Sequence, residues 1–377
     1  MKFTRAAMIF TFLSLLIAGA AVSADSAALP IRGLHCGAPS HDDIPLCVRF
    51  IREALPKEGV NVLVLEINYN YQYTRHPEIA GPRVLSKEDI KQLAAACKEA
   101  GVRLIPQINC LGHQSWSRNT DVLLRAHPEF DETPGKYPEN KGIYCRSYCP
   151  LHPQVHDVVF DLIDELAEAC DADAFHVGMD EVFIIGDDDC PRCKGKSKAD
   201  LFAQEVQTLH DHLAKSKRQM WMWGDRFLDG EATGVGEWEG AKNHTESAID
   251  KVPKDIVICD WHYEKAVPTA EYFAMKGFGA LACPWRKSDV ALTMLEWCDE
   301  VRERSNETLA PRMLGVLQTT WTGVGEFIRA YNGEEPRRGK GALEAADCFK
   351  KLFTEVRNIG NRPESPKTET KKTEEVK

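Results

Sequence analysis

Several features are missing from this 377-residue sequence, and each absence excludes a class of function. The formal net charge is −10 and no basic patch stands out, which argues against nucleic acid as a partner. No glycine-rich phosphate loop follows the first predicted strand, and no internal repeat occurs. The histidines fit no helix-borne zinc pattern such as His-Glu-x-x-His. We therefore expect neither a cofactor nor a metal in the site.

Long apolar runs are also absent, except at the N-terminus. Lys2 and Arg5 precede the apolar residues 6–21, and small residues at 22–24 supply a cleavage site. This layout is typical of a secretory signal peptide over residues 1–24. A retained membrane anchor is the alternative, although the run is short for a span. We expect an exported protein, periplasmic or secreted, that is not held in a membrane after the signal is removed.

The other end of the chain has a composition that cannot form a core. Residues 361–377 are rich in Lys, Glu, Thr, Pro and Ser, and we expect them to form a disordered charged tail. Residues 25–360 remain, with a length that suits one α/β barrel. We expect a single domain there.

Thirteen cysteines are present, an odd number whose pairing the sequence does not determine. Several, such as Cys97 and Cys170, sit inside apolar runs and are expected to be small core residues. A single CxxC motif, Cys190-Pro-Arg-Cys193, is compatible with half a zinc site or with a redox pair. We favour a local disulfide or two thiols that brace a loop, because a lone CxxC is weak evidence for either alternative.

Short apolar runs alternate with helical patterns along the chain. The runs cover residues 31–36, 60–68, 102–109, 174–178, 219–224, 256–261, 278–283 and 314–319. The helical patterns cover residues 86–101, 153–170, 198–216, 288–305 and 342–357. Near-continuous apolar strands suit a parallel sheet that is covered on both faces. Eight of them with intervening helices predict an α/β fold, the (β/α)8 TIM barrel, with a doubly wound open sheet as the alternative.

Residues 111–152, after the third predicted strand, contain little periodic structure and are rich in Gly, Pro, Asn, Tyr and His. A long loop in a compact domain is usually functional or mobile. In a barrel this loop would lie on the active-site face.

The fourth predicted strand ends abruptly in two adjacent carboxylates, Asp180 and Glu181. Neighbouring carboxylates repel each other when they are partly desolvated, so a chain rarely places them at the mouth of a core strand without a use. A surface turn in which Asp180 caps the next element is the alternative, but the flanking residues are apolar rather than turn-like. In a TIM barrel, chemistry gathers at this end of the strands.

Tryptophans stand at the ends of four other predicted strands. They are Trp223, Trp261, Trp285 and Trp321. An aromatic pocket with acids in its walls suits a sugar, because rings cover its apolar faces and polar groups bind its hydroxyls. A phosphorylated ligand would require more Arg and Lys.

The run of residues 175–182, Phe-His-Val-Gly-Met-Asp-Glu-Val, resembles the His-x-Gly-Gly-Asp-Glu signature of the family 20 glycoside hydrolases, the β-N-acetylhexosaminidases. Further similarity to that family lies in Arg32-Gly33 of the first strand, Ile105-Pro106-Gln107-Ile108 with Gly112-His113 in the third, Trp223 with Asp225 in the fifth, Trp261 in the sixth and Trp321 in the eighth. The resemblance covers roughly residues 31–330, and the fourth strand is its specific part.

The resemblance implies a retaining mechanism in which the substrate's own 2-acetamido oxygen is the nucleophile. Glu181 would be the general acid and then the base, and Asp180 would orient the acetamide N–H and stabilise positive charge. The tryptophans would line the pocket for the acetyl methyl group, and Arg32 would bind sugar hydroxyls. His113 and His176 would support the site, and Asp225 would contact the substrate. The expected substrate is a glycan or glycoconjugate that contains N-acetylhexosamine.

The sequence departs from the family pattern in several places. Met179 replaces the second Gly of the signature, which reduces backbone freedom beside the acids. Gln107 stands where the family often has Glu, and Gly323 where an acid usually follows the eighth-strand Trp. The family's seventh-strand Tyr is absent, and Tyr263 after the sixth strand is a candidate substitute. A non-catalytic sugar-binding barrel is therefore the alternative to a hydrolase, with a metal-dependent hydrolase as a third hypothesis.

Overall fold

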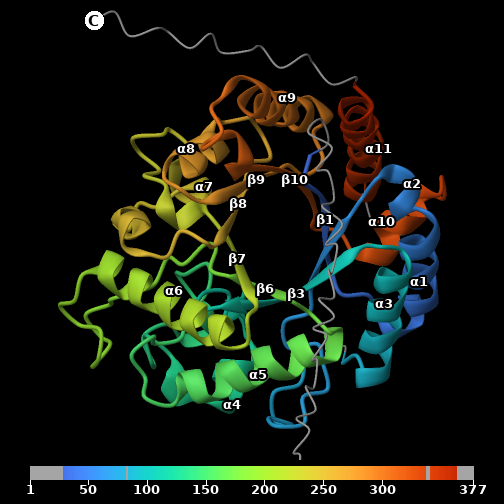
Figure 1. Cartoon of the computed structure of the whole chain (residues 1–377). Helices are drawn as coiled ribbons and strands as arrows, with labels where there is room; N and C mark the ends of the chain where they lie inside the picture. The colour runs from blue at the N-terminus through green and yellow to red at the C-terminus, as the bar shows by residue number, and fades with distance from the viewer. Residues whose placement is uncertain (1–28, 82–83, 337–339, 363–377) are drawn as a thin grey trace, which may run out of the picture.

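A computed structural model describes residues 29–81, 84–336 and 340–362, and eight parallel strands form a closed barrel in it (Figure 1). The strands are β1 (Ile31–Gly37), β2 (Val62–Glu66), β3 (Arg103–Cys110), β6 (Ala174–Gly178), β7 (Gln219–Trp223), β8 (Val257–Trp261), β9 (Gly279–Cys283) and β10 (Met313–Thr320). Neighbours around the barrel are neighbours in the chain, and β10 closes it against β1. The prediction of a (β/α)8 barrel is confirmed.

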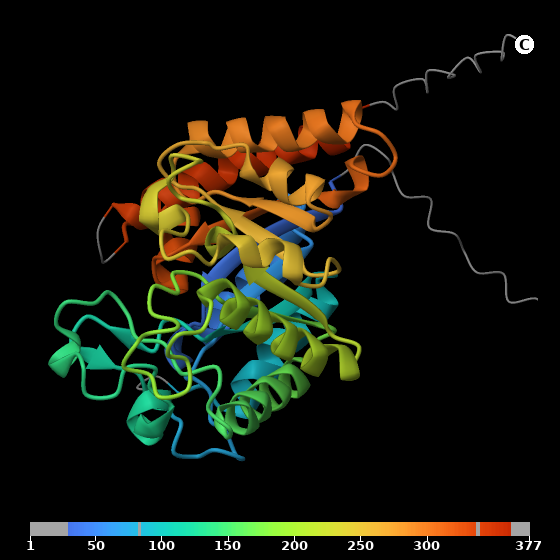
Figure 2. The same ribbon diagram turned by 90° about the vertical axis from the view of Figure 1, so that its left-hand side faces the viewer.

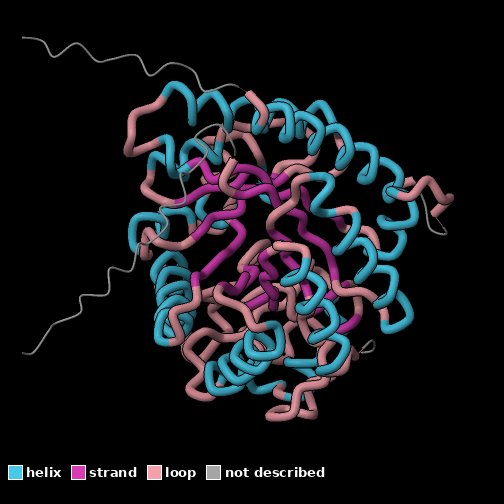
Figure 3. The backbone as a smooth tube through the Cα atoms, turned by 45° about the vertical axis from the view of Figure 1, so that its right-hand side comes forward, coloured by secondary structure: helices cyan, strands magenta, loops and turns pink. Residues whose placement is uncertain are grey.

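Helices surround the strands on the outside (Figure 3). They are α1 (Ile44–Glu53), α2 (Leu55–Glu58), α3 (Lys87–Glu99), α5 (Val155–Cys170), α6 (Lys198–Lys215), α8 (Thr269–Met275), α9 (Ser288–Arg304), α10 (Val324–Tyr331) and α11 (Gly341–Gly360). The five helical patterns predicted from the sequence correspond to α3, α5, α6, α9 and α11. The shorter helices α1, α2, α8 and α10 were not predicted.

The sequence signals at α3 show how such an element is fixed locally. The Ser86 side chain accepts a hydrogen bond from the Asp89 backbone N–H, and the Asp89 carboxylate accepts one from the Ser86 backbone N–H. This reciprocal capping satisfies two N–H groups that a helix start leaves without partners. Gly101 follows with a φ of 68°, a conformation that glycine adopts without strain.

Two apolar layers hold the barrel together. Alternate residues of β2 show the division, because Val62 and Val64 belong to the barrel interior whereas Leu63 and Leu65 pack under the helices. Successive side chains of a strand point to opposite faces, which produces this pattern. The interior cluster consists of Val62, Val64, Ile105, Ala174, Trp221, Trp223, Val257, Cys259, Trp261, Leu281, Cys283 and Leu317.

The segment between β3 and α5 forms the largest excursion from the barrel. It contains the two-residue strands β4 (Ser115–Trp116) and β5 (Asn119–Thr120), the short helix α4 (Val122–Ala126), and 3₁₀ turns at Pro128–Phe130 and Pro138–Asn140. Figure 2 shows it in teal and green, extending from one side of the barrel. The loop after β6 packs beside it, since the Cys145 thiol lies 3.5 Å from the Glu181 carbonyl oxygen.

The ends of the chain lie mostly outside the described residues. This applies to the signal peptide expected over 1–24 and to residues 363–377 of the expected tail. Arg362, the last described residue, forms ion pairs with Asp299 and Glu303. Among the helices of the described ranges, none combines the length and apolar character that a membrane crossing requires.

Replacing Gly315 with alanine should destabilise the barrel where β10 meets β1. Gly315 has a φ of 133°, and a Cβ there would lie 2.0 Å from the Ile31 carbonyl oxygen. Backbone strain and the clash together should lower the free energy of unfolding by about 2–4 kcal/mol, measured by urea denaturation. Gly37→Ala is the matched control, because a Cβ at Gly37 meets nothing within 4 Å. Equal stabilities of the two variants would contradict this account.

Candidate active site

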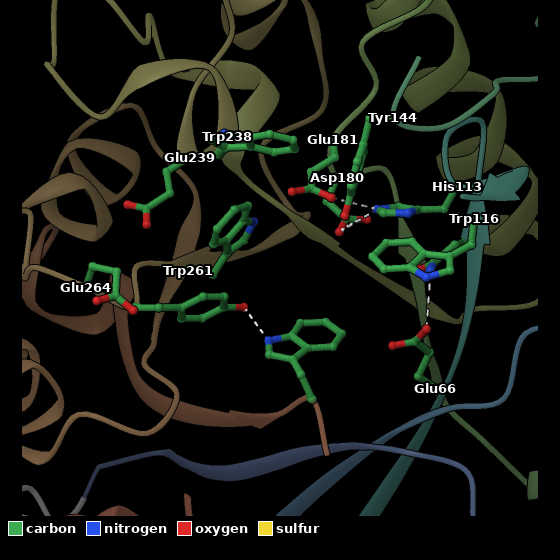
Figure 4. Close-up of a pocket in the computed structure, with 13 residues that line it drawn as sticks. Glu66, His113, Trp116, Tyr144, Asp180, Glu181, Trp238, Glu239, Trp261 and Glu264 are labelled. Carbon is green, nitrogen blue, oxygen red and sulfur yellow. Dashed lines mark hydrogen bonds and ion pairs between the residues drawn. The ribbon is translucent and has the colours of Figure 1, made fainter. Parts of the chain in front are cut away.

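A cavity of about 530 Å³ opens at the C-terminal ends of the strands. It is lined by Glu66, Asn109, His113, Trp116, Tyr144, Asp180, Glu181, Trp238, Glu239, Trp261, Tyr263, Glu264 and Trp321 (Figure 4). Both predicted catalytic residues line it, as do four of the predicted binding residues: His113, Trp261, Tyr263 and Trp321. The volume is typical of a small-molecule site.

The turn after β6 presents the two carboxylates together. Gly178, Met179 and Glu181 all have left-handed backbone conformations, with φ values of 70°, 73° and 47°. A Cβ at Gly178 would lie 2.8 Å from the Cα of Asn109, so glycine is required for the close approach to β3. Met179 adopts a conformation that suits the glycine of the family signature, and its side chain is fully buried in the core.

His113 holds both carboxylates from the side of the β3 loop (Figure 4). Its Nε2 lies 3.2 Å from Asp180 Oδ2 and 3.3 Å from Glu181 Oε2. Burial alone would lower the pKa of His113, but the Asp180 charge and the hydrogen bonds to both acids raise it well above its usual range. The result is an imidazolium that partly neutralises the carboxylate pair.

Asp180 keeps one oxygen free of protein partners. Its Oδ2 faces His113, whereas its Oδ1 is buried and has no hydrogen-bond partner among the described residues. A buried carboxylate oxygen without a donor is costly, so this atom is poised to accept a hydrogen bond from a ligand.

Asp225 anchors the turn from below rather than lining the cavity. It is buried, and its Oδ2 accepts hydrogen bonds from the Glu181 backbone N–H at 2.9 Å and from Arg226 Nε at 2.7 Å. Burial raises the pKa of Asp225 to about 6, against the opposing effect of Arg226. The expectation that Asp225 contacts the substrate is corrected, because its carboxylate is used inside the protein.

A polar network around Glu66 forms part of the floor of the cavity. Glu66 Oε1 accepts hydrogen bonds from Asn68 at 2.7 Å and from Asn109 at 3.3 Å. Burial first, and then the charge of Asp180, raise the pKa of Glu66. Gln107 continues the network beneath, where it donates to Asn109 Oδ1 at 2.8 Å and contacts His35 Nε2 at 3.1 Å. Gln107 therefore has a supporting position outside the cavity.

One wall of the cavity is a stack of aromatic side chains from β8 and β10. The rings of Trp261 and Tyr263 are stacked with centroids 4.9 Å apart. Trp321 Nε1 donates to the Tyr263 phenol oxygen at 2.8 Å. Trp261 Nε1 lies 3.4 Å from Asp225 Oδ1, which ties this wall to the anchor of the turn.

A second aromatic group lies at the rim and comes from loops. Tyr144 makes edge contacts with Trp116 and Trp238, at centroid distances of 5.4 and 4.9 Å. The two indoles are 62% and 46% exposed, so they offer open ring surface beside the cavity. Burial, followed by the charge of Glu181, raises the pKa of Tyr144, so the phenol stays protonated beside that acid.

Three predicted binding residues lie elsewhere. Arg32 is at the start of β1, about 16 Å along the strand from Gly37, the partner of pocket residue Glu66. Its guanidinium donates to the carbonyl oxygens of Leu29 and Gly59, so its expected contact with sugar hydroxyls is wrong.

The expectation that Trp223 and Trp285 contact the substrate is also corrected, because both side chains pack behind the cavity wall. Trp223 is 1% exposed inside the barrel and contacts the rings of His176 and Trp321. Trp285 packs edge-on against Tyr263 at 5.6 Å and carries Arg286 over its outer ring.

The sequence reasoning missed several cavity residues. They are Glu66, Asn109, Trp116, Tyr144, Trp238, Glu239 and Glu264. Glu66 and Asn109 stand at predicted strand ends and could have been chosen on that ground. Trp116 and Tyr144 lie in the long loop that was expected on the active-site face. Nothing in the local pattern marks Trp238.

Trp238 lies on the short helix α7 (Gly236–Glu239), which a buried ionic group holds in place. His262 Nδ1 lies 2.6 Å from Glu239 Oε2, and its Nε2 lies 3.4 Å from Asp260 Oδ1. Burial alone would lower the pKa of His262, but the two carboxylates raise it to about 10.

Within the part of the chain that the structure describes, three groups of side chains could hold a metal ion. They are His113 with Asp180 and Glu181, His76 with Glu78 and His127, and Glu132 with Cys149, Cys190 and Cys193. The first is the pair of active-site carboxylates with His113, where the imidazolium already supplies the positive charge. The second is partly exposed at the surface.

The stability that His262 contributes should depend on pH. Its raised pKa gives a contribution that is complete below about pH 6.5 and is lost as the pH rises through about 10. The stability difference between wild type and His262→Gln should therefore shrink above pH 6.5, by up to about 1.4 kcal/mol per pH unit in urea denaturation. His244→Gln, at an exposed position, is the control. A pH-independent difference for His262→Gln would refute the ionic role.

Comparison with known proteins identifies the family. The model of the glycosyl hydrolase family 20 catalytic domain matches residues 65–331, more than half of the chain. A β-hexosaminidase of Vibrio furnissii is 26% identical over 279 residues, which are 72% of this chain and 38% of that protein. A β-hexosaminidase of Emericella nidulans is 24% identical over 189 residues, 47% of this chain and 29% of that protein.

Solved structures agree on the fold. The chitobiase of Flavobacterium johnsoniae superposes with a TM-score of 0.59 at 18% identity, covering 88% of this chain and 52% of that one. An exo-β-N-acetylglucosaminidase of Vibrio harveyi gives a TM-score of 0.60 at 16% identity, covering 88% and 58%. The chain thus spans less than two thirds of the length of these relatives. On the family match and the barrel together, the chain belongs to glycosyl hydrolase family 20.

Proposed function

We propose that this protein is a glycosidase that removes N-acetylhexosamine residues from glycans by a substrate-assisted retaining mechanism. The observation that carries the proposal is the buried Asp180 Oδ1, which has no partner among the described residues and lies beside Glu181. A substrate amide N–H is a donor that would satisfy this oxygen. Family membership and the resemblance to β-hexosaminidases support the same activity.

The position of the two acids argues against the two-carboxylate mechanism. In that mechanism the two carboxyl groups flank the scissile bond, about 5–5.5 Å apart in retaining enzymes and about 6.5–9.5 Å apart in inverting ones. Here carboxylate oxygens of Asp180 and Glu181 lie within 4.8 Å of each other and share one imidazole nitrogen. They occupy one side of the cavity (Figure 4), so a nucleophile carried by the substrate fits better.

The reaction proceeds in two steps. Glu181 donates its proton to the glycosidic oxygen while the acetamide oxygen attacks the anomeric carbon, and the leaving alcohol departs. Asp180 Oδ1 accepts the acetamide N–H and stabilises the positive charge of the oxazolinium ion. Glu181, now ionised, takes a proton from water as that water attacks the anomeric carbon and reopens the ring. His113 keeps both acids in position throughout.

Tyr263 takes the place of the family's seventh-strand Tyr in this proposal. Its phenol oxygen accepts a hydrogen bond from Trp321 Nε1, and its hydroxyl also contacts Thr319. When substrate is bound, the O–H would rotate to donate to the acetamide oxygen. Trp261 and Trp321 would pack against the acetyl methyl.

The sugar's outer hydroxyls have acceptors on another wall. Glu239 and Glu264 line the cavity across from His113 and Glu66 (Figure 4). They would bind the hydroxyls that Arg32, and the acid that the family carries at the position of Gly323, were expected to bind. The exposed indoles of Trp116 and Trp238 at the rim would stack on a further sugar unit, so we infer that the substrate extends beyond one residue.

Glu181→Gln should nearly abolish cleavage because amide nitrogen cannot supply the proton. We expect kcat/KM to fall by about 10²–10⁴ on an N-acetylglucosamine disaccharide, and by less on the 4-nitrophenyl glycoside, whose leaving group needs little protonation. Release of sugar and of nitrophenol measures the two losses. Glu296→Gln, on the exposed side of α9, should leave both rates unchanged.

Two outcomes would contradict the proposal. Full activity of Glu181→Gln would remove Glu181 as the acid. Wild-type protein that binds N-acetylglucosamine in calorimetry but cleaves no glycan in a broad panel would instead support a sugar-binding barrel.

Asp180→Asn should selectively impair the use of the acetamide group. Wild-type protein should cleave the 4-nitrophenyl N-acetyl-β-glucosaminide and not the plain β-glucoside, and a thiazoline mimic of the oxazolinium should inhibit it. The variant should bind the thiazoline about 10–100-fold more weakly, since a hydrogen bond to a charged group contributes about 1.5–3 kcal/mol. Asp42→Asn, at an exposed position, is the control. Unchanged thiazoline affinity in Asp180→Asn would exclude the orienting role.

A further inference from the structure

A second polar cluster lies where the loop after β3 meets the loop after β6. It consists of Glu132, Cys149, Cys190 and Cys193, all fully buried. One carboxylate oxygen and the three sulfur atoms lie within 4.8 Å of one another. Glu132 and Cys149 belong to the loop that carries Tyr144, and the other two follow Glu181 in the chain. None of the four lines the cavity of the active site.

We propose that these four residues bind a structural Zn²⁺ ion. The Sγ of Cys149 lies 3.5 Å from that of Cys193 and 3.5 Å from that of Cys190. Ligand sulfurs on a tetrahedral zinc ion, with Zn–S distances of about 2.3 Å, lie about 3.7 Å apart. The cluster thus has the dimensions of a zinc site, and four protein ligands would complete it without an open position for catalysis.

Glu132 supplies the observation that points to a cation. Its Oε1 accepts a hydrogen bond from the Asp187 backbone N–H at 3.2 Å, whereas its Oε2 is buried with no partner among the described residues. Burying a carboxylate oxygen without a donor or counter-charge is expensive. A metal ion held by the three thiolates would supply that charge.

The chain around Cys149 resembles the chain around Cys190 in sequence and in its contacts to sulfur. Each of the segments Cys149-Pro150-Leu151 and Cys190-Pro191-Arg192 places a proline directly after the first cysteine. The Cys193 backbone N–H donates to the Cys190 sulfur at 3.4 Å, and the Leu151 N–H donates to the Cys149 sulfur. These two N–H groups hold the sulfur atoms of Cys190 and Cys149 in position.

A disulfide explains less of this arrangement. The sequence favoured a local bond between Cys190 and Cys193 or two thiols bracing a loop. The structure brings a third thiol, Cys149, equally close to both. Any single disulfide would engage only two of the three thiols, whereas one zinc ion would engage all three together with the Glu132 carboxylate.

The site would act as a clamp on the active site. It would join the long loop that carries His113 and Tyr144 to the loop that carries Asp180 and Glu181. The Cys145 thiol, 3.5 Å from the Glu181 carbonyl oxygen, lies on the same stretch of chain as Cys149. Binding free energy at a structural zinc site contributes directly to stability.

The first experiment measures metal and cysteine state in the full-length protein. We expect about one zinc ion per chain by elemental mass spectrometry of protein purified without chelator and dialysed against trace Zn²⁺. Alkylation under denaturing, non-reducing conditions with chelator should modify Cys149, Cys190 and Cys193. Absence of stoichiometric metal, or a disulfide between any two of these cysteines, would overturn the proposal.

Variants assign the ligands. Cys190→Ala should lose the zinc. Cys97→Ala, which replaces a cysteine on the buried face of α3, should keep it. If Cys190→Ala does not fold, Glu132→Gln provides the test, since it should fold and bind zinc at least tenfold more weakly in a chelator competition. His152→Gln is its control, because the His152 ring packs on Phe130 and its Nδ1 accepts from the Gln154 N–H.

Metal substitution in the wild-type protein reports on the ligand set and needs no variant that could fail to fold. Co²⁺ in place of Zn²⁺ should give the visible absorption bands of a tetrahedral site. It should also give a thiolate-to-cobalt charge-transfer band with the intensity expected for three sulfur ligands. Zinc lost in His152→Gln but retained in Glu132→Gln would refute Glu132 as the fourth ligand. Octahedral Co²⁺ spectra would refute the site altogether.

Discussion

The active site depends on one constraint, the sharp left-handed turn that ends β6. Consecutive side chains of a strand point to opposite faces, so a continued strand could not present Asp180 and Glu181 to one cavity. Positive φ values at Met179 and Glu181 turn both carboxylates the same way, at a cost of about 1–3 kcal/mol each for non-glycine residues. Two interactions offset that strain: His113 lies between the carboxylates, and Asp225 accepts the Glu181 N–H.

Most of the fold could be predicted because the barrel strands are near-continuous apolar runs, and all eight were found within one or two residues. The missed helices α1, α2, α8 and α10 are shorter than most of those found and do not have their long periodic patterns. For the site, it was harder to predict at which end of a strand a residue lies and whether its side chain reaches the cavity. Arg32 and Trp223 lie on the right strands, but one is at the wrong end and the other faces the packed interior. Sequence position gives the strand, whereas the cavity depends on which side chains remain exposed at its mouth.

The loop residues of the site could not be predicted for a different reason. Trp116 and Tyr144 come from distant parts of the loop after β3, and Trp238 comes from the short helix α7. The three side chains meet through edge contacts between their rings. No local periodicity records such contacts. The position of Trp238 also depends on His262, a buried histidine whose charge is set by two carboxylates from different elements. A sequence pattern shows neither burial nor charge pairing across loops.

Met179 shows how this chain departs from its family without losing the turn. Glycine would relieve the backbone strain, but it could not fill the space that the buried Met179 side chain occupies in the core. Core packing, rather than backbone freedom, therefore fixes this side of the turn. The opposite side rests on the long β3 loop, whose regular elements are very short. Its position therefore depends on side-chain links to neighbouring parts of the barrel, among them Tyr148 with Glu205 of α6. The cluster of Glu132 with three cysteines is the fully buried link to the β6 loop. A metal at that cluster would make the geometry of Asp180 and Glu181 depend on an ion that takes no part in the chemistry.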